Sequence, residues 1–281
     1  MSTVCKVLGV ARSNVHVRAT RQPCWSDARK HRRPADDACL VTEIKAEILS
    51  LPTYGYRRAC ALLRRRRAGQ GRAMVNHKRV YRVMREQRLL LPRSPRRGAD
   101  RRHEGTIAVD RSNMRWCSDA LEIRADNAEV VRMAFSLDCC DREVMSWVGV
   151  ANAGIDGNLV RDMMLEAVEK RFGSPRANTP IEWLSDNGPP YIAGDTRRFA
   201  RELKLVPLTT PILSPQSNGM AEAFVNTLKR DYVSVSVLPD ARSILEALPR
   251  WIEHYNEHHP HSALNMCSPR MFRREQLLRC E

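Results

Sequence analysis

RWCSDALEIR, residues 115–124, has side chains that alternate between two faces, as they do in a β-strand. Two more strand-like runs follow closely, EVVRMAFSLD (129–138) and EVMSWVGVA (143–151), and the turn CCDR joins them. One face of the first run carries Cys117, Asp119, Leu121 and Ile123, and the other carries Trp116, Ser118, Ala120 and Glu122. Three strands in succession predict a meander.

Helices and strands alternate after this meander. We expect a helix at 157–172, a strand at IEWLSD (181–186), a helix near 195–204, a strand near 205–209, a helix carrying 220–233 and a last helix at 240–258. This order predicts an α/β domain with a mixed sheet.

Helical periodicity dominates the residues before the meander. Residues 2–20 predict two short helices around Gly9, and further helices are expected at 37–51, 55–68 and 76–89, the last capped by Asn76. Polar, proline-containing segments separate them. The predicted organisation is a partial helix-turn-helix with a linker at 1–36, a basic helical module at 37–90, an Arg/Pro-rich linker at 91–105 and the α/β domain with a C-terminal helix at 106–281.

Positive charge is concentrated in the first third of the chain. The 281 residues have a net charge of +15 and a sequence pI of about 9.9. Residues 1–103 contain 26 Lys and Arg against 7 Asp and Glu, whereas the rest contains 21 against 25. Such a surplus favours a polyanionic partner, most commonly nucleic acid, although a single run such as 64–67 is equally explained as a solvated helix face.

The cysteines indicate neither a zinc site nor a disulfide framework. There are nine, none of them in a C-x-x-C pair. No signal peptide and no apolar run of membrane-spanning length is present in the sequence. We therefore expect reduced thiols, mostly buried as small apolar groups, in a protein of the cytoplasm with no membrane association.

Three carboxylates occupy positions where a metal site is plausible. Asp119 lies in mid-strand, where a buried charge is costly unless it is paired or metal-bound. Asp186 ends the fourth strand and opens DNGPPY, and Glu222 lies in the first turn of a helix entered through SPQSNGMAE. Taken alone, Asp186 is also explained as a turn residue and Glu222 as a charge favoured by the helix dipole. Together they predict a site for Mg²⁺ or Mn²⁺.

The spacing of these carboxylates resembles a known pattern. Between Asp119 and Asp186 lie 66 residues, and between Asp186 and Glu222 lie 35. The flanking motifs agree, namely RWCSD (115–119), SDNG (185–188), LPTYGYRR (51–58), NHKRVYRVM (76–84) and YNEHHPHSALNMCSP (255–269). Over nearly its whole length the chain resembles the second-reading-frame transposase subunits of bacterial insertion sequences, within the retroviral-integrase-like superfamily with an Asp, Asp-35-Glu site.

The resemblance implies a fold and a reaction. The fold is an RNase H-like core, a five-stranded mixed sheet with strand two antiparallel and helices on both faces, preceded by an all-α helix-turn-helix-like DNA-binding region. The reaction is DNA cleavage and strand transfer, in which a 3′-hydroxyl attacks a phosphodiester with two Mg²⁺ or Mn²⁺ ions per active site. Asp119, Asp186 and Glu222 become the metal ligands and catalytic residues.

The resemblance also suggests supporting and DNA-binding residues. Lys229, seven residues after Glu222, is implied as a DNA contact on nearly the same helix face. Further DNA contacts are expected at Asn218, Arg57, Arg58, Lys78, Arg79 and Arg82, and Asn187, Gly188, Ser214, Asn218 and Gly219 are expected to support the site. Gly188 is expected to permit a tight turn and Asn218 to cap the Glu222 helix.

Two further clusters have alternative interpretations. Asp138 is a possible fourth metal ligand, but a turn role for it and Asp141 is favoured. Tyr255, Asn256, His259 and His261 form a possible metal cluster, but packing around the last helix is favoured.

Alternative functions and partners also stay open. A structure-selective nuclease of the same fold would hydrolyse DNA without joining it, and a regulator would only occupy element ends. We expect a homo-oligomer on DNA, at element ends and target, in a bacterial cytoplasm. Because the helix-turn-helix begins short, an upstream-frame transposase subunit is a further expected partner.

Overall fold

The computed structural model describes residues 2–7, 9–22, 37–49, 51–92, 109–210 and 218–280. These divide into two compact units, Met1–Leu40 and Val41–Glu281. The first unit contains α1 (Ser2–Val7) and α2 (Arg12–Ala19), two short helices separated at Gly9 as predicted. Gly9 has a φ of +61°, a left-handed conformation that glycine adopts without strain. The predicted linkers lie mostly outside the described residues.

Three helices precede the sheet, α3 (Ala38–Ile48), α4 (Tyr56–Gly69) and α5 (His77–Glu86). Asn76 is the N-cap of α5 as predicted, because its side-chain oxygen accepts a hydrogen bond from the Lys78 amide at 2.9 Å. The predicted inward face of α5 is buried, with Val80, Val83 and Met84 at most 1% exposed. Leu63 of α4 is fully buried as well.

A five-stranded mixed sheet forms the centre of the second unit, as predicted. Its strands are β1 (Arg115–Arg124), β2 (Val130–Asp138), β3 (Val144–Ala151), β4 (Ile181–Ser185) and β5 (Leu205–Thr209). They lie in the order β3-β2-β1-β4-β5. β2 is antiparallel to both of its neighbours, whereas β4 runs parallel to β1 and β5. The RNase H-like arrangement is therefore confirmed.

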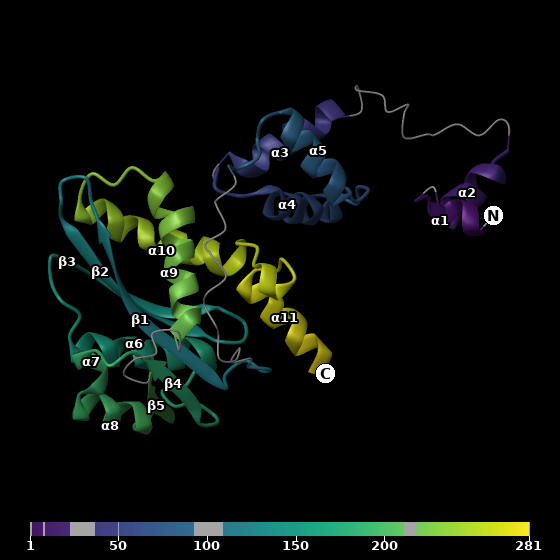
Figure 1. Cartoon of the computed structure of the whole chain (residues 1–281). Helices are drawn as coiled ribbons and strands as arrows, with labels where there is room; N and C mark the ends of the chain where they lie inside the picture. Colours follow the sequence, from purple (N-terminus) through teal and green to yellow (C-terminus); the bar gives the residue numbers. More distant parts are fainter. Residues whose placement is uncertain are drawn as a thin grey trace. The chain divides into compact units, whose positions relative to one another are not determined.

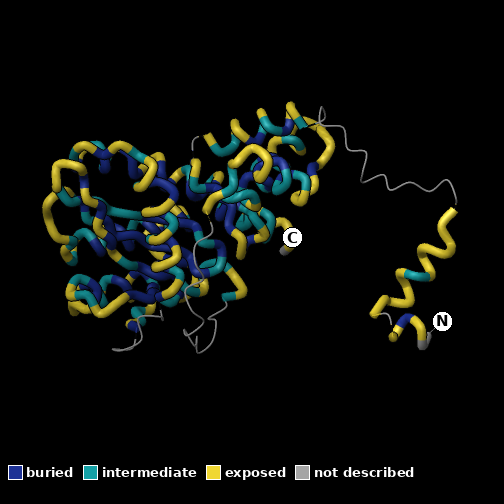
Figure 2. The backbone as a smooth tube through the Cα atoms, turned by 45° about the horizontal axis from the view of Figure 1, so that its top comes forward, coloured by how far each residue is buried: buried dark blue, intermediate teal, exposed yellow. Residues whose placement is uncertain are grey.

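Helices cover both faces of this sheet (Figure 1). α9 (Gly219–Asp231) and α10 (Ala241–Glu257) pack on one face, where Phe224 and Leu248 join a core with Leu121 and Phe135. α6 (Gly157–Phe172) and α8 (Gly194–Glu202) pack on the other face around Trp116 and Trp183, with α7 (Pro189–Ile192) beside them. Figure 2 shows the buried strands between these more exposed helices. The first face also carries the alternate residues Asp119 and Cys117, so the predicted alternation is correct.

Some elements differ from expectation. α11 (Pro269–Cys280) and the short α7 were not predicted, and α9 ends at Asp231, two residues before the expected end. The described cysteines are free; Cys5, Cys60, Cys117 and Cys139 are buried, whereas Cys39 is exposed. Among the described helices, none combines the length and apolar character needed to cross a membrane.

Candidate active site

The pairing of β1 with β4 determines where Asp119 and Asp186 lie relative to one another. β1 and β4 are parallel, with Trp116 paired to Trp183 and Cys117 to Leu184. Continuing this offset of 67 residues places Asp186, just past the end of β4, beside Asp119. Adjacent strands lie about 4.8 Å apart, so this register places the two residues next to each other in the middle of the sheet.

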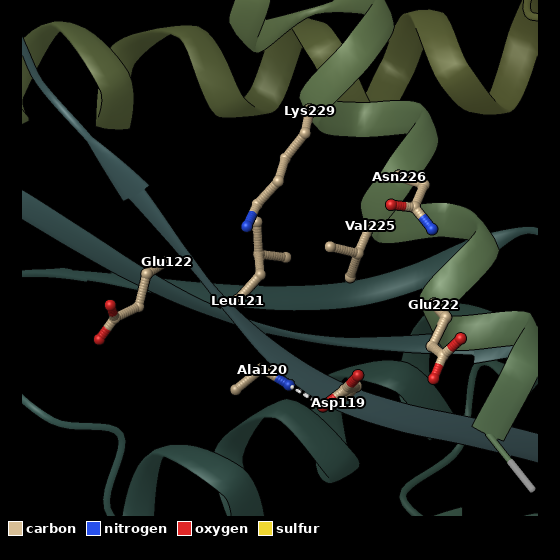
Figure 3. Close-up of a pocket in the computed structure, with 8 residues that line it drawn as sticks. All are labelled: Asp119, Ala120, Leu121, Glu122, Glu222, Val225, Asn226 and Lys229. Atoms are coloured by element: carbon tan, nitrogen blue, oxygen red, sulfur yellow. Dashed lines mark hydrogen bonds between the residues drawn. The ribbon is translucent and has the colours of Figure 1, made fainter. Parts of the chain in front are cut away.

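Glu222 lies on the helix that packs over β1. It lies in the first turn of α9, which packs over β1. Asp119 and Glu222 line one open groove of about 480 Å³, together with Asn226 and Lys229 of α9. Figure 3 shows the carboxylates of Asp119 and Glu222 turned toward one another, with Lys229 two turns further along the helix. Asp186 does not line this groove.

No basic side chain among the described residues neutralises Asp119, Asp186 or Glu222. Burial raises the pKa of Asp119, and the negative charges of Asp186 and Glu222 raise it further, against one hydrogen bond from the Ala120 amide. Within the described ranges, no salt bridge joins any of the three to an Arg or Lys side chain. The donor set is therefore oxygen-rich and anionic, which suits a hard divalent cation.

The three carboxylates are not close enough together to coordinate one metal ion in this structure. In the part of the chain that the structure describes, no three His, Cys, Asp or Glu side chains lie close enough together to hold an ion. Ser214, predicted as a support, lies outside the described residues.

A buried hydrogen-bond network joins the three elements that carry these carboxylates. Asn218, next to α9, donates through Nδ2 to the carbonyl oxygen of Ser118 at 3.1 Å. The Ser118 hydroxyl lies 2.9 Å from the hydroxyl of Tyr191, which belongs to α7. Ser118 precedes Asp119, Tyr191 lies five residues after Asp186 and Asn218 lies four residues before Glu222, so the network connects the segments beside the three carboxylates. Sequence patterns gave no signal for Ser118 or Tyr191, because their contact depends on the fold.

Comparison with known proteins identifies the family. A family model described as an HTH-like domain matches residues 34–98, and two described as an integrase core domain match 109–215 and 207–269. Transposase InsD for insertion element IS2D from Escherichia coli K12 is 48% identical over 277 residues, which cover 98% of this chain and 91% of that protein. Transposase InsD for insertion element IS2-9 from the same strain is also 48% identical, over 98% and 90%.

The chain belongs to the insertion-element transposases. The predicted family is therefore confirmed, and with it the enzyme class of transposases and integrases.

Solved structures with a similar arrangement are more distant. The catalytic core domain of BIV integrase is 14% identical and covers 60% of this chain and 99% of its own, with a TM-score of 0.40. The catalytic domain of Mos1 mariner transposase is 14% identical and covers 50% and 70%, with a TM-score of 0.42. At such identities these structures add nothing about the chemistry of the present transposase.

Two expectations about supporting residues of the transposase are wrong in detail. Asn218 occupies the N-cap position of α9, but its side chain makes no capping hydrogen bond, because its amide is directed to β1. Gly188 has a φ of −60°, so no left-handed turn requires glycine there. Glycine leaves space there instead, since an added Cβ would lie 3.0 Å from Asp186 Oδ1 and would require that oxygen to shift. The Gly188 amide also donates to that oxygen at 3.0 Å.

The favoured interpretation of Asp138 as a turn residue agrees with its contacts. Its Oδ1 accepts hydrogen bonds from the backbone amides of Cys140 and Asp141. Its Oδ2 accepts from the Asn113 amide, from Trp116 Nε1 and from Arg171. Five donors leave this fully buried carboxylate no place among the metal ligands.

The C-terminal Tyr/Asn/His cluster packs internally, as favoured. Tyr255, Asn256, His259 and His261 are all buried. Asn256 exchanges two hydrogen bonds with the backbone of Val144, one from its Nδ2 and one to its Oδ1. This cluster therefore fixes α10 and the following turn against β3.

The predicted DNA-binding side chains differ in how far they are available. Lys78, Arg57 and Lys229 are exposed. Arg82 pairs with Glu86 at 3.1 Å and, like Arg79, is only partly exposed. Arg58 is engaged with Asp231, and Asn218 is buried. Asn226 lines the active-site groove and was not predicted, although its position four residues after Glu222 places it on the same helix stripe.

Proposed function

We propose that this transposase cuts DNA at the ends of its element and joins them to target DNA, with two Mg²⁺ or Mn²⁺ ions held by Asp119, Asp186 and Glu222. The observation that supports the proposal is the register of β1 and β4, whose offset of 67 residues equals the separation of Asp119 and Asp186, with α9 and its Glu222 packed over β1. When bound, the ions would activate an attacking oxygen and stabilise the leaving one.

The three carboxylates and Lys229 have complementary tasks in this proposal. The three carboxylates bind the ions. Burial and the charges of Asp186 and Glu222 raise the pKa of Asp119, and a bound cation would lower that pKa again. Lys229, exposed and on the same side of α9 as Glu222, would hold a DNA phosphate beside them. The groove is open on the solvent side, as a polymeric substrate requires.

Partners follow from the same chemistry. DNA is the substrate, and the exposed Arg57 and Lys78 of the helical module would contact its backbone. Since an element has two ends, we propose that copies of the chain act together on DNA, in the bacterial cytoplasm. An upstream-frame subunit as an additional partner stays a prediction.

A labelled duplex carrying an end of the encoding element, incubated with the transposase and Mg²⁺, tests this function. We expect end-specific nicking followed by products longer than the substrate, in which the labelled 3′ end is joined to other DNA. Shorter products alone would support the alternative of a hydrolytic nuclease. Retention of DNA without any cleavage would support a regulator and contradict the proposal.

Gly188→Ala is expected to weaken the metal site while the fold stays stable. The new Cβ would displace the Asp186 carboxylate by a few tenths of an ångström, and changes next to a ligand typically cost about 10–100-fold in metal affinity or activity. The measurement is the Mg²⁺ concentration for half-maximal cleavage, with thermal unfolding in parallel. Gly194→Ala is the matched control, because nothing lies within 4 Å of its added Cβ. An unchanged Mg²⁺ requirement in Gly188→Ala would contradict this role.

A further inference from the structure

Residues of α4 and the loop before it contact the C-terminal part of the catalytic domain. The hydroxyl of Tyr54 lies 2.7 Å from Nδ1 of His259, and both side chains are buried. Arg58 donates through Nη1 to Asp231 Oδ2 at 2.8 Å, and its guanidinium carbon is 5.3 Å from the centre of the Tyr54 ring. Arg65 adds hydrogen bonds to the carbonyl oxygens of His258 and Met266. The motif LPTYGYRR (51–58) thus supplies an internal contact.

Asp231 is the buried anion at the centre of this contact. Its side chain is 0% exposed, whereas that of Arg58 is 24% exposed. The neighbouring Arg230 binds both carboxylate oxygens, at 2.7 and 2.6 Å. His259 lies 3.8 Å away, but burial lowers its pKa far below the ordinary value, so it stays neutral. Arg58 is therefore the cation from a distant part of the chain that balances Asp231.

α9 connects this contact to the active site. Glu222 lies in the first turn of α9 and Asp231 is its last residue. Nine residues correspond to two and a half turns, or roughly 13 Å, so the two carboxylates project from opposite sides of one short helix. Lys229 lies on the side of Glu222, facing the groove (Figure 3). One rigid element thus carries groove residues on one side and the partner of Arg58 on the other.

We propose that the contact between Arg58 and Asp231 couples the basic helical module to the position of Glu222. Arg58 is then a positioning residue and not a phosphate contact. The inference rests on the proposed function, because it assigns how the DNA-binding module sets the active site. A buried ion pair at one end of a helix and a reacting carboxylate at the other form a contiguous path along which a shift of the module is transmitted.

Variants on both sides of the contact test this proposal in the full-length transposase. Arg58→Gln and Asp231→Asn are expected to lower the rate of cleavage and joining on saturating end DNA by about tenfold or more, because a misplacement of about 1 Å is costly in catalysis. Neither variant should change the slope of log affinity against log salt for a duplex, since no phosphate contact is lost. Arg58→Lys, which keeps the charge, should recover part of the rate.

Arg57→Gln is the matched control, because Arg57 is the exposed neighbour of Arg58. It is expected to reduce the salt slope by about 0.9, the value for one lost phosphate contact, whereas Arg58→Gln should leave that slope unchanged. Arg230→Gln is a second control, since Asp231 keeps Arg58 in that variant.

The double variant Arg58→Gln/Asp231→Asn decides between coupling and independent roles. If both residues act through one shared contact, the double variant should lose no more rate than either single variant. Additive losses, or a salt slope lowered in Arg58→Gln but not in Asp231→Asn, would overturn the proposal. Hydrogen exchange of the α4 amides, expected to accelerate equally in both single variants, reports on the contact without any chemistry. Failure of the proposed function would therefore leave this test intact.

Discussion

Asp119→Asn, Asp186→Asn and Glu222→Gln are each expected to reduce Mg²⁺-dependent cleavage and joining by at least about a thousandfold. Metal ions supply several kcal/mol of charge stabilisation in phosphodiester chemistry, and each 1.36 kcal/mol corresponds to about tenfold in rate. Each substitution keeps the shape of the side chain but removes one anionic ligand. Because the ions need all three carboxylates, the loss should be similar for the three variants.

Duplex binding and cleavage of labelled end DNA, measured over a range of Mg²⁺ concentrations, check this expectation. DNA affinity should be nearly unchanged, because phosphate binding depends on basic side chains. Glu122→Gln is the matched control: Glu122 lines the same groove on β1 but projects away from Asp119 and Glu222, and pairs with Arg132 at 2.7 Å. Wild-type joining by any of the three variants would refute the assignment of that residue.

Arg171→Met is expected to lower the free energy of unfolding by about 3–5 kcal/mol, the usual cost of leaving buried charges without a partner. The Arg171 side chain is 1% exposed. It pairs with Asp138 at 3.1 Å, with Asp141 at 2.6 Å and with Glu143 at 2.6 Å. Glu143 keeps Arg270 and Arg273 in the variant, but Asp138 and Asp141 keep no basic partner among the described residues.

Denaturant unfolding at several pH values measures the loss of unfolding free energy, and the pKa of Asp141 predicts how that loss depends on pH. Burial and the charge of Asp138 raise the pKa of Asp141 to about 6, above the ordinary 3.8, although Arg171 opposes the shift. Loss of Arg171 raises that pKa further, so the folded variant binds the proton more tightly than the unfolded chain. The folded wild type loses this proton near pH 6 and the folded variant keeps it to higher pH, so the deficit should grow as the pH rises above about 6 and be smallest below it.

Lys170→Met is the matched control for this prediction. Lys170 is the neighbouring basic residue on α6, but its side chain is 54% exposed and pairs with Glu166 on the surface. Surface pairs contribute little, so the control should stay within about 1 kcal/mol of the wild type. A deficit in Arg171→Met that is equal at every pH would mean that lost packing, and not unpaired charge, causes it.

Local patterns were sufficient for most of the secondary structure, and the candidate site stays a prediction made from them. The predicted strand at 115–124 and helix at 157–172 have the observed bounds, because alternation and helical periodicity directly reflect which side is buried. The separation of Asp119 and Asp186 equals the offset in register between β1 and β4, so the sequence spacing already contained their juxtaposition. α11 was missed because its sequence, rich in arginine and preceded by a proline motif, has only a weak apolar stripe.

The order of the elements followed from local periodicity, and the family followed from the resemblance of the motifs. The three carboxylates stay a prediction from the same motifs. Only the tertiary structure decided which charges face one another. Arg57 and Arg58 are adjacent and identical in type, yet one is exposed and the other pairs with the buried Asp231, 173 residues away. Likewise Asp138 faces Arg171 inside the domain and Asp119 faces the groove. The physical reason is that the environment of a charge depends on partners distant in the chain, which local periodicity does not encode.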